Sequence, residues 1–137
     1  MWKCRNCGRI FEKIGQVHSC QIVPLGDHFK NKVLAKGIFD ELLKKINDKV
    51  GTSEIVSLPC CVHLYGKYEF LAILPKKDRL EIRFSLDRAL NGSRIKQTVP
   101  LSKSSFKNCI DLKSSTDLDK ELIGWLEESY HLKEKQF

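Results

Sequence analysis

Hydrophobic and polar residues alternate without a break over residues 80–87, which is the period of a strand with one buried face. The segment 68–74 is apolar at nearly every position, as expected for a central strand with both faces covered. Pro75 and the polar residues 76–79 lie between the two and favour a tight turn. We therefore predict a β-hairpin here and a further strand over 60–65.

Two turns set the predicted register of these three strands. A two-residue turn at 66–67 suits type II′, which takes glycine first, and it would pair Val62 with Leu71. The second turn would pair Ile73 with Ile82. Both registers gather apolar side chains on one face, so we expect the core there. That face would comprise Cys60, Val62, Leu64, Leu71, Ile73, Leu80, Ile82, Phe84 and Leu86, with Glu69 as the exception.

The opposite face mixes aromatic rings with a histidine and an arginine. It would carry Cys61, His63, Tyr65, Tyr68, Phe70, Ala72, Leu74, Glu81, Arg83 and Ser85. An aromatic face of this kind is unusual when it is fully exposed to water. It is either a binding surface or a surface that another segment covers.

Two segments show the period of amphipathic helices. Residues 33–50 carry an apolar stripe, and a last helix is expected to begin at Ser115 or Thr116, with a capping-box-like start at Thr116 and Asp119. The first stripe comprises Leu34, Ile38, Leu42, Ile46 and Val50, with Phe39 and Leu43 beside it, and the second comprises Leu118, Leu122, Trp125, Leu126 and Tyr130. Weaker strands are expected over 94–99 and 106–112, with a short edge piece at 55–58.

Together these elements predict an α+β fold, in which two main helices pack on an antiparallel sheet of four to five strands. We expect a metal-binding finger over 1–22 and the α+β domain over 27–137, joined by a linker with Pro24 and Gly26. No apolar run approaches the ~18 residues of a membrane span, so we expect no membrane partner. The first residues lack the features of a secretory signal, which predicts a cytoplasmic protein with reduced thiols.

Four potential metal ligands lie in the first 20 residues, at Cys4, Cys7, His18 and Cys20. A Cys-x-x-Cys turn presents two sulfurs to one ion, and Gly8 can take the positive φ that such a turn needs. On an extended strand, His18 and Cys20 leave the same face and can reach the same ion. Four nitrogen and sulfur ligands complete a tetrahedron, so we predict one structural Zn²⁺.

The ligand spacing differs from that of the DNA-reading finger, which needs about twelve residues between the pairs and two histidines on a helix. The pair His18 and Cys20 is too closely spaced for a helix. We therefore predict a zinc ribbon or knuckle, which can bind nucleic acid or protein or simply stabilise this end of the chain. Trp2, Ile10, Phe11 and Ile14 are expected to cover the site.

The same residues resemble a known family. The finger resembles the N-terminal finger of an uncharacterised bacterial family, domain of unknown function 5655, on Trp2, Cys4, Cys7, Gly8, Arg9, Phe11, Gln16, His18, Ser19 and Cys20. Later segments are similar to it more loosely, at 27–29, at 39–42, at 114–122 and at Tyr130. The resemblance implies an α+β domain with a metal site, and it implies no activity.

Charge adds a candidate partner. The chain has 24 Lys and Arg against 17 Asp and Glu, a net charge of +7. A basic protein with a zinc finger fits a polyanion, so the leading prediction is a non-enzymatic module that binds nucleic acid or a protein. Rings on the sheet face would stack on bases while cations meet phosphates. The candidate ligand-binding residues are His63, Tyr65, Tyr68, Arg83, Arg94 and Lys96.

The alternative is a small-molecule-binding protein or a cysteine-dependent enzyme. Cys61, His63 and Arg83 share the predicted face, and a thiol beside an imidazole and a guanidinium can be activated as a nucleophile. No group that would orient the histidine is visible in the sequence. The adjacent Cys60 and Cys61 are expected to point to opposite faces, which makes a shared metal ion unexpected. Cys109 is expected to be a small core residue.

Overall fold

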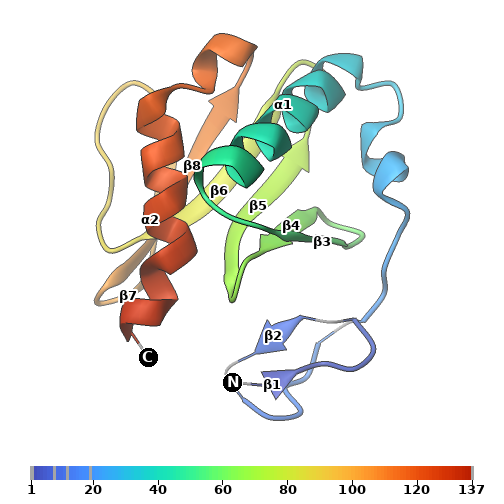
Figure 1. Cartoon of the computed structure of the whole chain (residues 1–137), viewed down its shortest axis with the longest axis vertical. Coiled ribbons are helices and arrows are strands. Elements are labelled where there is room, and N and C mark those ends of the chain that lie inside the picture. The colour runs from blue at the N-terminus through green and yellow to red at the C-terminus, as the bar shows by residue number, and fades with distance from the viewer. Residues whose placement is uncertain (1, 8, 12, 19, 137) are drawn as a thin grey trace.

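The described part of the chain contains a small two-stranded sheet, a larger sheet of six strands and two long helices (Figure 1). A computed structural model describes residues 2–7, 9–11, 13–18 and 20–136, with side chains as far as residue 132. The strands are β1 (Trp2–Lys3), β2 (Ile10–Phe11), β3 (Glu54–Ser57), β4 (Val62–Tyr65), β5 (Glu69–Pro75), β6 (Leu80–Leu86), β7 (Ile95–Ser102) and β8 (Ser105–Leu112). The helical segments are η1 (Leu25–Phe29), α1 (Val33–Lys49), η2 (Ser115–Asp117) and α2 (Lys120–Gln136).

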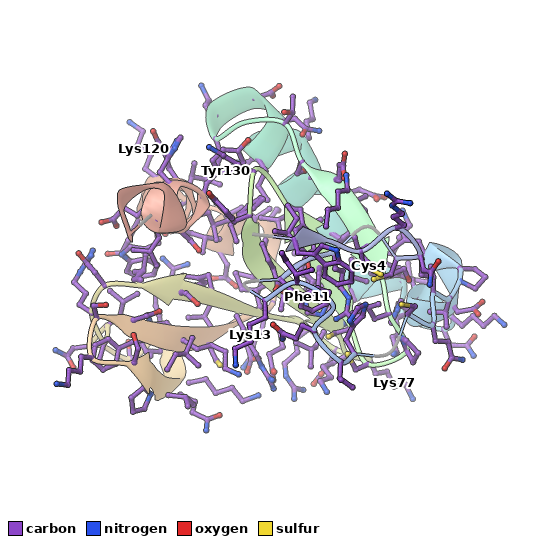
Figure 2. The ribbon with its side chains drawn as sticks, turned by 90° about the horizontal axis from the view of Figure 1, so that it is seen from below. Cys4, Phe11, Lys13, Lys77, Lys120 and Tyr130 are labelled. Atoms are coloured by element: carbon purple, nitrogen blue, oxygen red, sulfur yellow. The ribbon has the colours of Figure 1, made fainter. Side chains whose placement is uncertain are left out.

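The main sheet is antiparallel and has six strands in the order β3-β4-β5-β6-β8-β7. Both long helices lie on the same side of it (Figures 1 and 2). The α+β class is therefore confirmed, and the sheet has one strand more than expected because the edge piece β3 pairs with β4 along its full length. We call the other side of the sheet the helix-free face; it carries His63, Ala72, Arg83 and Cys109 on four neighbouring strands.

The core lies between the sheet and the helices. The predicted pairing of Ile73 with Ile82 is confirmed, whereas the predicted pairing of Val62 with Leu71 is wrong, because Val62 pairs with Ile73. Over residues 62–64 the shift is two residues, so the side chains of this part of β4 stay on their expected faces. Of the predicted core face, Val62, Leu64, Leu71, Ile73, Leu80, Ile82, Phe84 and Leu86 are buried. Cys60 is exposed, because it lies in the turn before β4 instead of within the strand.

A β-bulge explains the shifted register. Leu64 pairs with Leu71 and Tyr65 pairs with Glu69, so β5 contains one extra residue, Phe70. The ring of Phe70 is buried on the helix side, not on the opposite face as predicted, and its carbonyl accepts a 2.7 Å hydrogen bond from the Ser129 hydroxyl of α2. The same bulge moves Glu69 from the predicted core face to the helix-free face.

Tyr130 of α2 packs against the turn between β4 and β5. Its ring lies edge-on to Phe70, with the centroids 4.9 Å apart, and its hydroxyl donates to the Thr52 carbonyl at 2.9 Å. Gly66 does not have the positive φ of a type II′ turn. A Cβ at Gly66 would instead lie 2.5 Å from Cζ of Tyr130, so glycine is needed here for close approach.

Helix α1 begins and ends close to the predicted bounds, and Ala35, Ile38, Phe39, Leu42 and Ile46 form its buried stripe. The predicted first position of that stripe, Leu34, is 47% exposed. The last helix begins later than predicted. A capping box of Ser114 and Asp117 begins the short segment η2. Helix α2 starts after Asp119, whose carboxylate accepts from the Leu122 backbone N–H at 3.0 Å. No helix among the described residues is long and apolar enough to cross a bilayer.

The close approach of Tyr130 gives a testable expectation. Replacing Gly66 with Ala should lower the free energy of unfolding by about 1–3 kcal/mol, the usual cost of overpacking. The matched control is Gly37→Ala in the first half of α1, where a Cβ meets no atom within 4 Å. That control should raise the free energy of unfolding by about 0.5–1 kcal/mol. Denaturant unfolding measures both, and equal effects of the two substitutions would contradict the role given to Tyr130.

Candidate functional site

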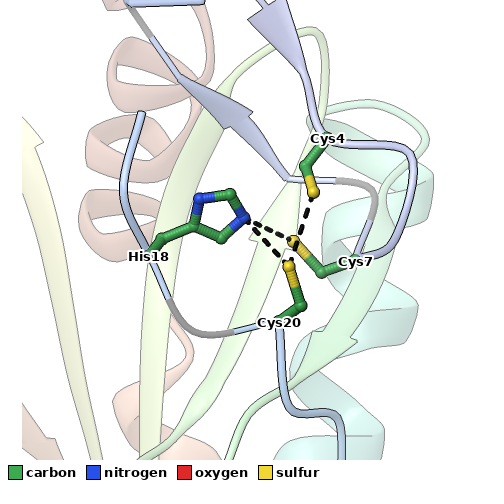
Figure 3. A group of neighbouring side chains, drawn as sticks. All are labelled: Cys4, Cys7, His18 and Cys20. Atoms are coloured by element: carbon green, nitrogen blue, oxygen red, sulfur yellow. Dashed lines mark hydrogen bonds between the residues drawn. The ribbon is translucent and has the colours of Figure 1, made fainter. Parts of the chain in front are cut away.

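The finger is built on a short two-stranded sheet. Trp2 pairs with Phe11 and Lys3 pairs with Ile10, and the Cys4 backbone N–H donates to the Arg9 carbonyl at 2.8 Å. This tight connection holds the Cys-x-x-Cys segment against the strands, which presents the sulfurs of Cys4 and Cys7 on one side (Figure 3). Gly8, which was expected to take a positive φ, lies outside the described residues.

The four predicted ligands converge on one point (Figure 3). Their ligand atoms all lie within 4.8 Å of one another. The Cys4 and Cys20 sulfurs are 3.5 Å apart, and Nε2 of His18 lies 3.4 Å from the Cys7 sulfur and 3.2 Å from the Cys20 sulfur. These separations are close to those of ligands around one tetrahedral ion. The group could therefore hold a metal ion.

The ring of His18 is turned so that Nε2 faces the sulfurs. Its Nδ1 lies 2.5 Å from the Gln16 carbonyl. Because a carbonyl oxygen only accepts, Nδ1 donates to it, and Nε2 is the ring nitrogen that faces the sulfurs, which is the usual orientation of a histidine bound to a metal. The Phe11 ring packs against the imidazole, with the centroids 4.1 Å apart.

The thiols of the finger influence one another. A hydrogen bond from the Cys7 backbone lowers the pKa of Cys4 to about 7. The hydrogen bond between Cys20 and Cys4, followed by burial, raises the pKa of Cys20 to about 11. Negative charge at one sulfur thus opposes ionisation of the next. A bound cation would reverse this effect, because it stabilises thiolates directly.

Of the four residues expected to cover the finger, Trp2 and Phe11 pack beside the imidazole of His18, whereas Ile10 and Ile14 do not. Trp2 lies 6.1 Å from Phe11 between ring centroids. Ile10 packs against a small cluster on the main sheet that includes Tyr65, so it joins the finger to the α+β domain. Ile14, expected over the metal site, is 86% exposed.

A second group of potential ligands lies at the start of β4. The Cys61 sulfur is 3.0 Å from Nε2 of His63 and 2.8 Å from the Cys60 sulfur. The prediction that Cys60 and Cys61 point apart is therefore wrong, because Cys60 precedes the strand and does not follow its alternation. Nδ1 of His63 is hydrogen-bonded to the Glu69 carboxylate, which supplies the orienting group that the sequence did not reveal.

These contacts shift the ionisation of the pair. Burial acts to lower the pKa of His63, but hydrogen bonds with Cys61 and Glu69 outweigh it and raise that pKa to about 10. Burial likewise opposes ionisation of Cys61, yet the hydrogen bonds with His63 and Cys60 hold the pKa of this thiol below its usual range. The thiol–imidazole pair is therefore polarised towards thiolate and imidazolium.

The predicted ligand-binding residues do not form one surface. Tyr65 is buried and Tyr68 is half-buried. The guanidinium of Arg83 and the ammonium of Lys96 both bind the buried Glu81, at 2.8 and 2.7 Å. These two cations lie on the helix-free face with His63.

Arg94 lies apart from these residues. Its guanidinium contacts the carboxylates of Asp119 and Glu121 at 3.0 Å and donates to the Asp117 carbonyl at 2.8 Å. It also lies 5.5 Å from the centroid of the Trp125 ring. Arg94 therefore attaches the start of β7 to the start of α2.

A pocket of about 360 Å³ opens on the helix-free face. The charged and titratable lining comes from Cys61, His63, Glu69, Arg83 and Lys107, and Leu101 supplies part of the apolar wall. Lys107 was not among the predicted site residues. Its position follows from the pairing of β6 with β8, which no sequence signal fixes.

The chain is thus an α+β domain preceded by a Cys/His group that could hold a metal ion. Residues 25–133 match the family described as Domain of unknown function (DUF5655). This match covers well over half of the chain, so the chain belongs to that family; the finger precedes the matched range. Comparison with curated proteins and with solved structures gives no significant match.

The finger provides the next test. Replacing Cys7 with Ala should lower the zinc content by one equivalent per chain, because the finger has little apolar core to hold the other three ligands in place once one is lost. The control is Cys109→Ala, which also removes a buried thiol but lies outside both ligand groups. Zinc content of the purified proteins can be measured by atomic emission. Unchanged zinc in Cys7→Ala would contradict the assignment of the finger as a metal site.

Proposed function

We propose that this chain is a non-enzymatic binding module. In this proposal the finger over 1–22 holds one structural zinc ion, and the helix-free face of the domain over 27–137 binds an anionic group of its partner. The phosphates of a nucleic acid are the leading source of that group, in line with the net charge of +7. A protein partner remains the other outcome of the test below.

The observation that carries the proposal is the charge of the pocket on the helix-free face. Lys107 is half-buried in the pocket wall and has no ion pair within the described ranges. Arg83 lies in the same wall, and the one carboxylate that it contacts, Glu81, is shared with Lys96. Among the residues that line the pocket, the cations Arg83 and Lys107 outnumber the one carboxylate, Glu69, which is itself bonded to His63, so the pocket carries net positive charge. An anionic group would complement it.

The zinc ion is proposed to be structural because all four ligand positions come from the protein. Cys4, Cys7, His18 and Cys20 would leave no position for a substrate. The finger has almost no apolar core of its own within the described residues. A metal ion would therefore supply the free energy that folds this segment.

The burial of the aromatic rings favours phosphate contacts over base stacking. Tyr65 is 5% exposed and packs with Val56 and Leu58, and Phe70 is in the main core. Stacking needs an accessible ring face. We therefore expect binding with little sequence preference and a marked dependence on salt.

The rival function, a small-molecule-binding protein or a cysteine-dependent enzyme, is favoured by two contacts of His63. Glu69 orients His63, and His63 contacts the Cys61 thiol, which is the order of groups that activates a nucleophile. The pocket volume also lies within the range of small-ligand sites. Arg83 is held by Glu81 and does not contact the thiol within the described hydrogen bonds.

The proposal predicts a defined effect of the unpaired lysine. Binding of a short fluorescent single-stranded DNA should weaken between about 50 and 200 mM salt. Lys107→Gln should weaken it several-fold and reduce the slope of log affinity against log salt by about 0.7, the value for one phosphate contact on a single strand. The matched control is Lys77→Gln, which removes the same charge from an exposed turn outside the pocket.

Adenosine monophosphate serves as the second probe in the same assay. Binding of the nucleotide but not of the DNA would assign the pocket to a small anion. Equal losses for Lys107→Gln and Lys77→Gln would show that binding depends on overall charge and would contradict the role of the pocket. Binding of neither probe would contradict recognition of nucleic acid and would leave a protein partner as the other form of the proposal.

A further inference from the structure

The chain contains two histidines that are oriented in the same way. In the finger, Nδ1 of His18 faces a carbonyl and Nε2 faces sulfur. At the start of β4, Nδ1 of His63 faces the Glu69 carboxylate and Nε2 faces the Cys61 sulfur. A metal-bound imidazole usually has a hydrogen-bond acceptor at Nδ1. Its Nε2 then faces the metal, beside other ligand atoms such as sulfur.

We propose that Cys60, Cys61 and His63 bind a second metal ion, a thiophilic divalent cation such as Zn²⁺, and that Glu69 positions His63 for it. The three ligand atoms lie within 4.8 Å of one another. Two thiolates and one imidazole form a donor set that selects zinc over magnesium or calcium. This inference does not depend on the proposed binding of anions.

The local fold brings the three donors together. Pro59 and Cys60 form a turn before β4, and the Leu58 backbone N–H donates to the Cys61 carbonyl at 3.0 Å across it. The side chains of the two cysteines therefore project from a bend and not from an extended strand. Their sulfurs lie next to each other instead of on opposite faces. His63 follows two residues later, on the helix-free face.

The bulge at Phe70 supplies the positioning residue. Without the extra residue, Glu69 would point to the core side of β5; with it, Glu69 pairs with Tyr65 and reaches His63. The His63 side chain is 16% exposed and that of Glu69 is 35% exposed, so the hydrogen bond is partly shielded from water. Such acceptors fix the ring and strengthen the bond from the histidine to the metal.

The donor atoms need one adjustment to fit zinc. A tetrahedral ion with bonds of about 2.3 Å places two sulfurs about 3.8 Å apart, and the Cys60 and Cys61 sulfurs are 2.8 Å apart. Cys60 is exposed and lies in a turn, so its side chain can rotate outwards without disturbing the core. Three protein ligands leave a fourth position for water or another donor.

Zinc content of the full chain tests the inference. The wild-type protein should contain two zinc ions per chain, and Cys60→Ala should contain one. This variant is the sharpest choice because Cys60 is exposed, and retention of the finger zinc reports that the protein is intact. Cys109→Ala should retain both ions, since Cys109 belongs to neither group.

The positioning role has its own readout. Glu69→Gln should lower the zinc affinity of the second site by about 10–100-fold, the usual effect of losing a carboxylate behind a ligating histidine. A competition titration with a chromophoric chelator resolves the two sites, and the finger affinity should not change. A loss at both sites would indicate a general structural effect and would contradict the positioning role.

Other results would overturn the second metal site. One zinc ion in the wild-type protein and in Cys60→Ala, with loss only in Cys7→Ala, would overturn the second site. In that case rapid alkylation of Cys61 by iodoacetamide would assign the group to a free nucleophile. Slow alkylation in a wild-type protein with two zinc ions, and fast alkylation after chelation, would support the proposal.

Discussion

One extra residue in β5 determines how this sheet presents its chemistry. The bulge buries the Phe70 ring beneath Tyr130 and turns Glu69 outwards to His63. The carbonyl that the bulge removes from the ladder is satisfied by the Ser129 hydroxyl, so helix α2 stabilises the irregularity directly. The core contact and the histidine partner therefore depend on the same backbone feature, and neither would exist in a regular hairpin.

The alternation of the strands predicted the α+β class, the faces of β4–β6 and the helices because burial imposes a period of two or 3.6 on the sequence. The bulge was not predicted, because it interrupts that period at one position and leaves it unchanged on either side. The only sign of it was Glu69, which did not fit the apolar face. From the sequence, Gly66 was explained by a type II′ turn. Glycine is instead needed there because Tyr130, which is distant in sequence, packs too closely for a side chain.

The candidate sites could likewise be predicted where their residues are close in sequence, and were missed where tertiary packing decides their position. The finger ligands could be identified because Cys4 and Cys7 lie close in sequence and their spacing is set by the geometry of one ion. The group at Cys60 and Cys61 was missed because strand alternation was extended two residues beyond the start of β4. Arg94 was assigned to the sheet face by its basic character alone, but its position depends on the acids of α2, which are distant in sequence.

The central claim is that the bulge at Phe70 exists and places Glu69 beside His63. The most direct measurement is the set of nuclear Overhauser contacts between β4 and β5 in the labelled protein. The account predicts backbone contacts between Tyr65 and Glu69, together with contacts from the Phe70 ring to Tyr130. Contacts of Tyr65 with Tyr68, and a Phe70 ring without contacts to α2, would contradict it.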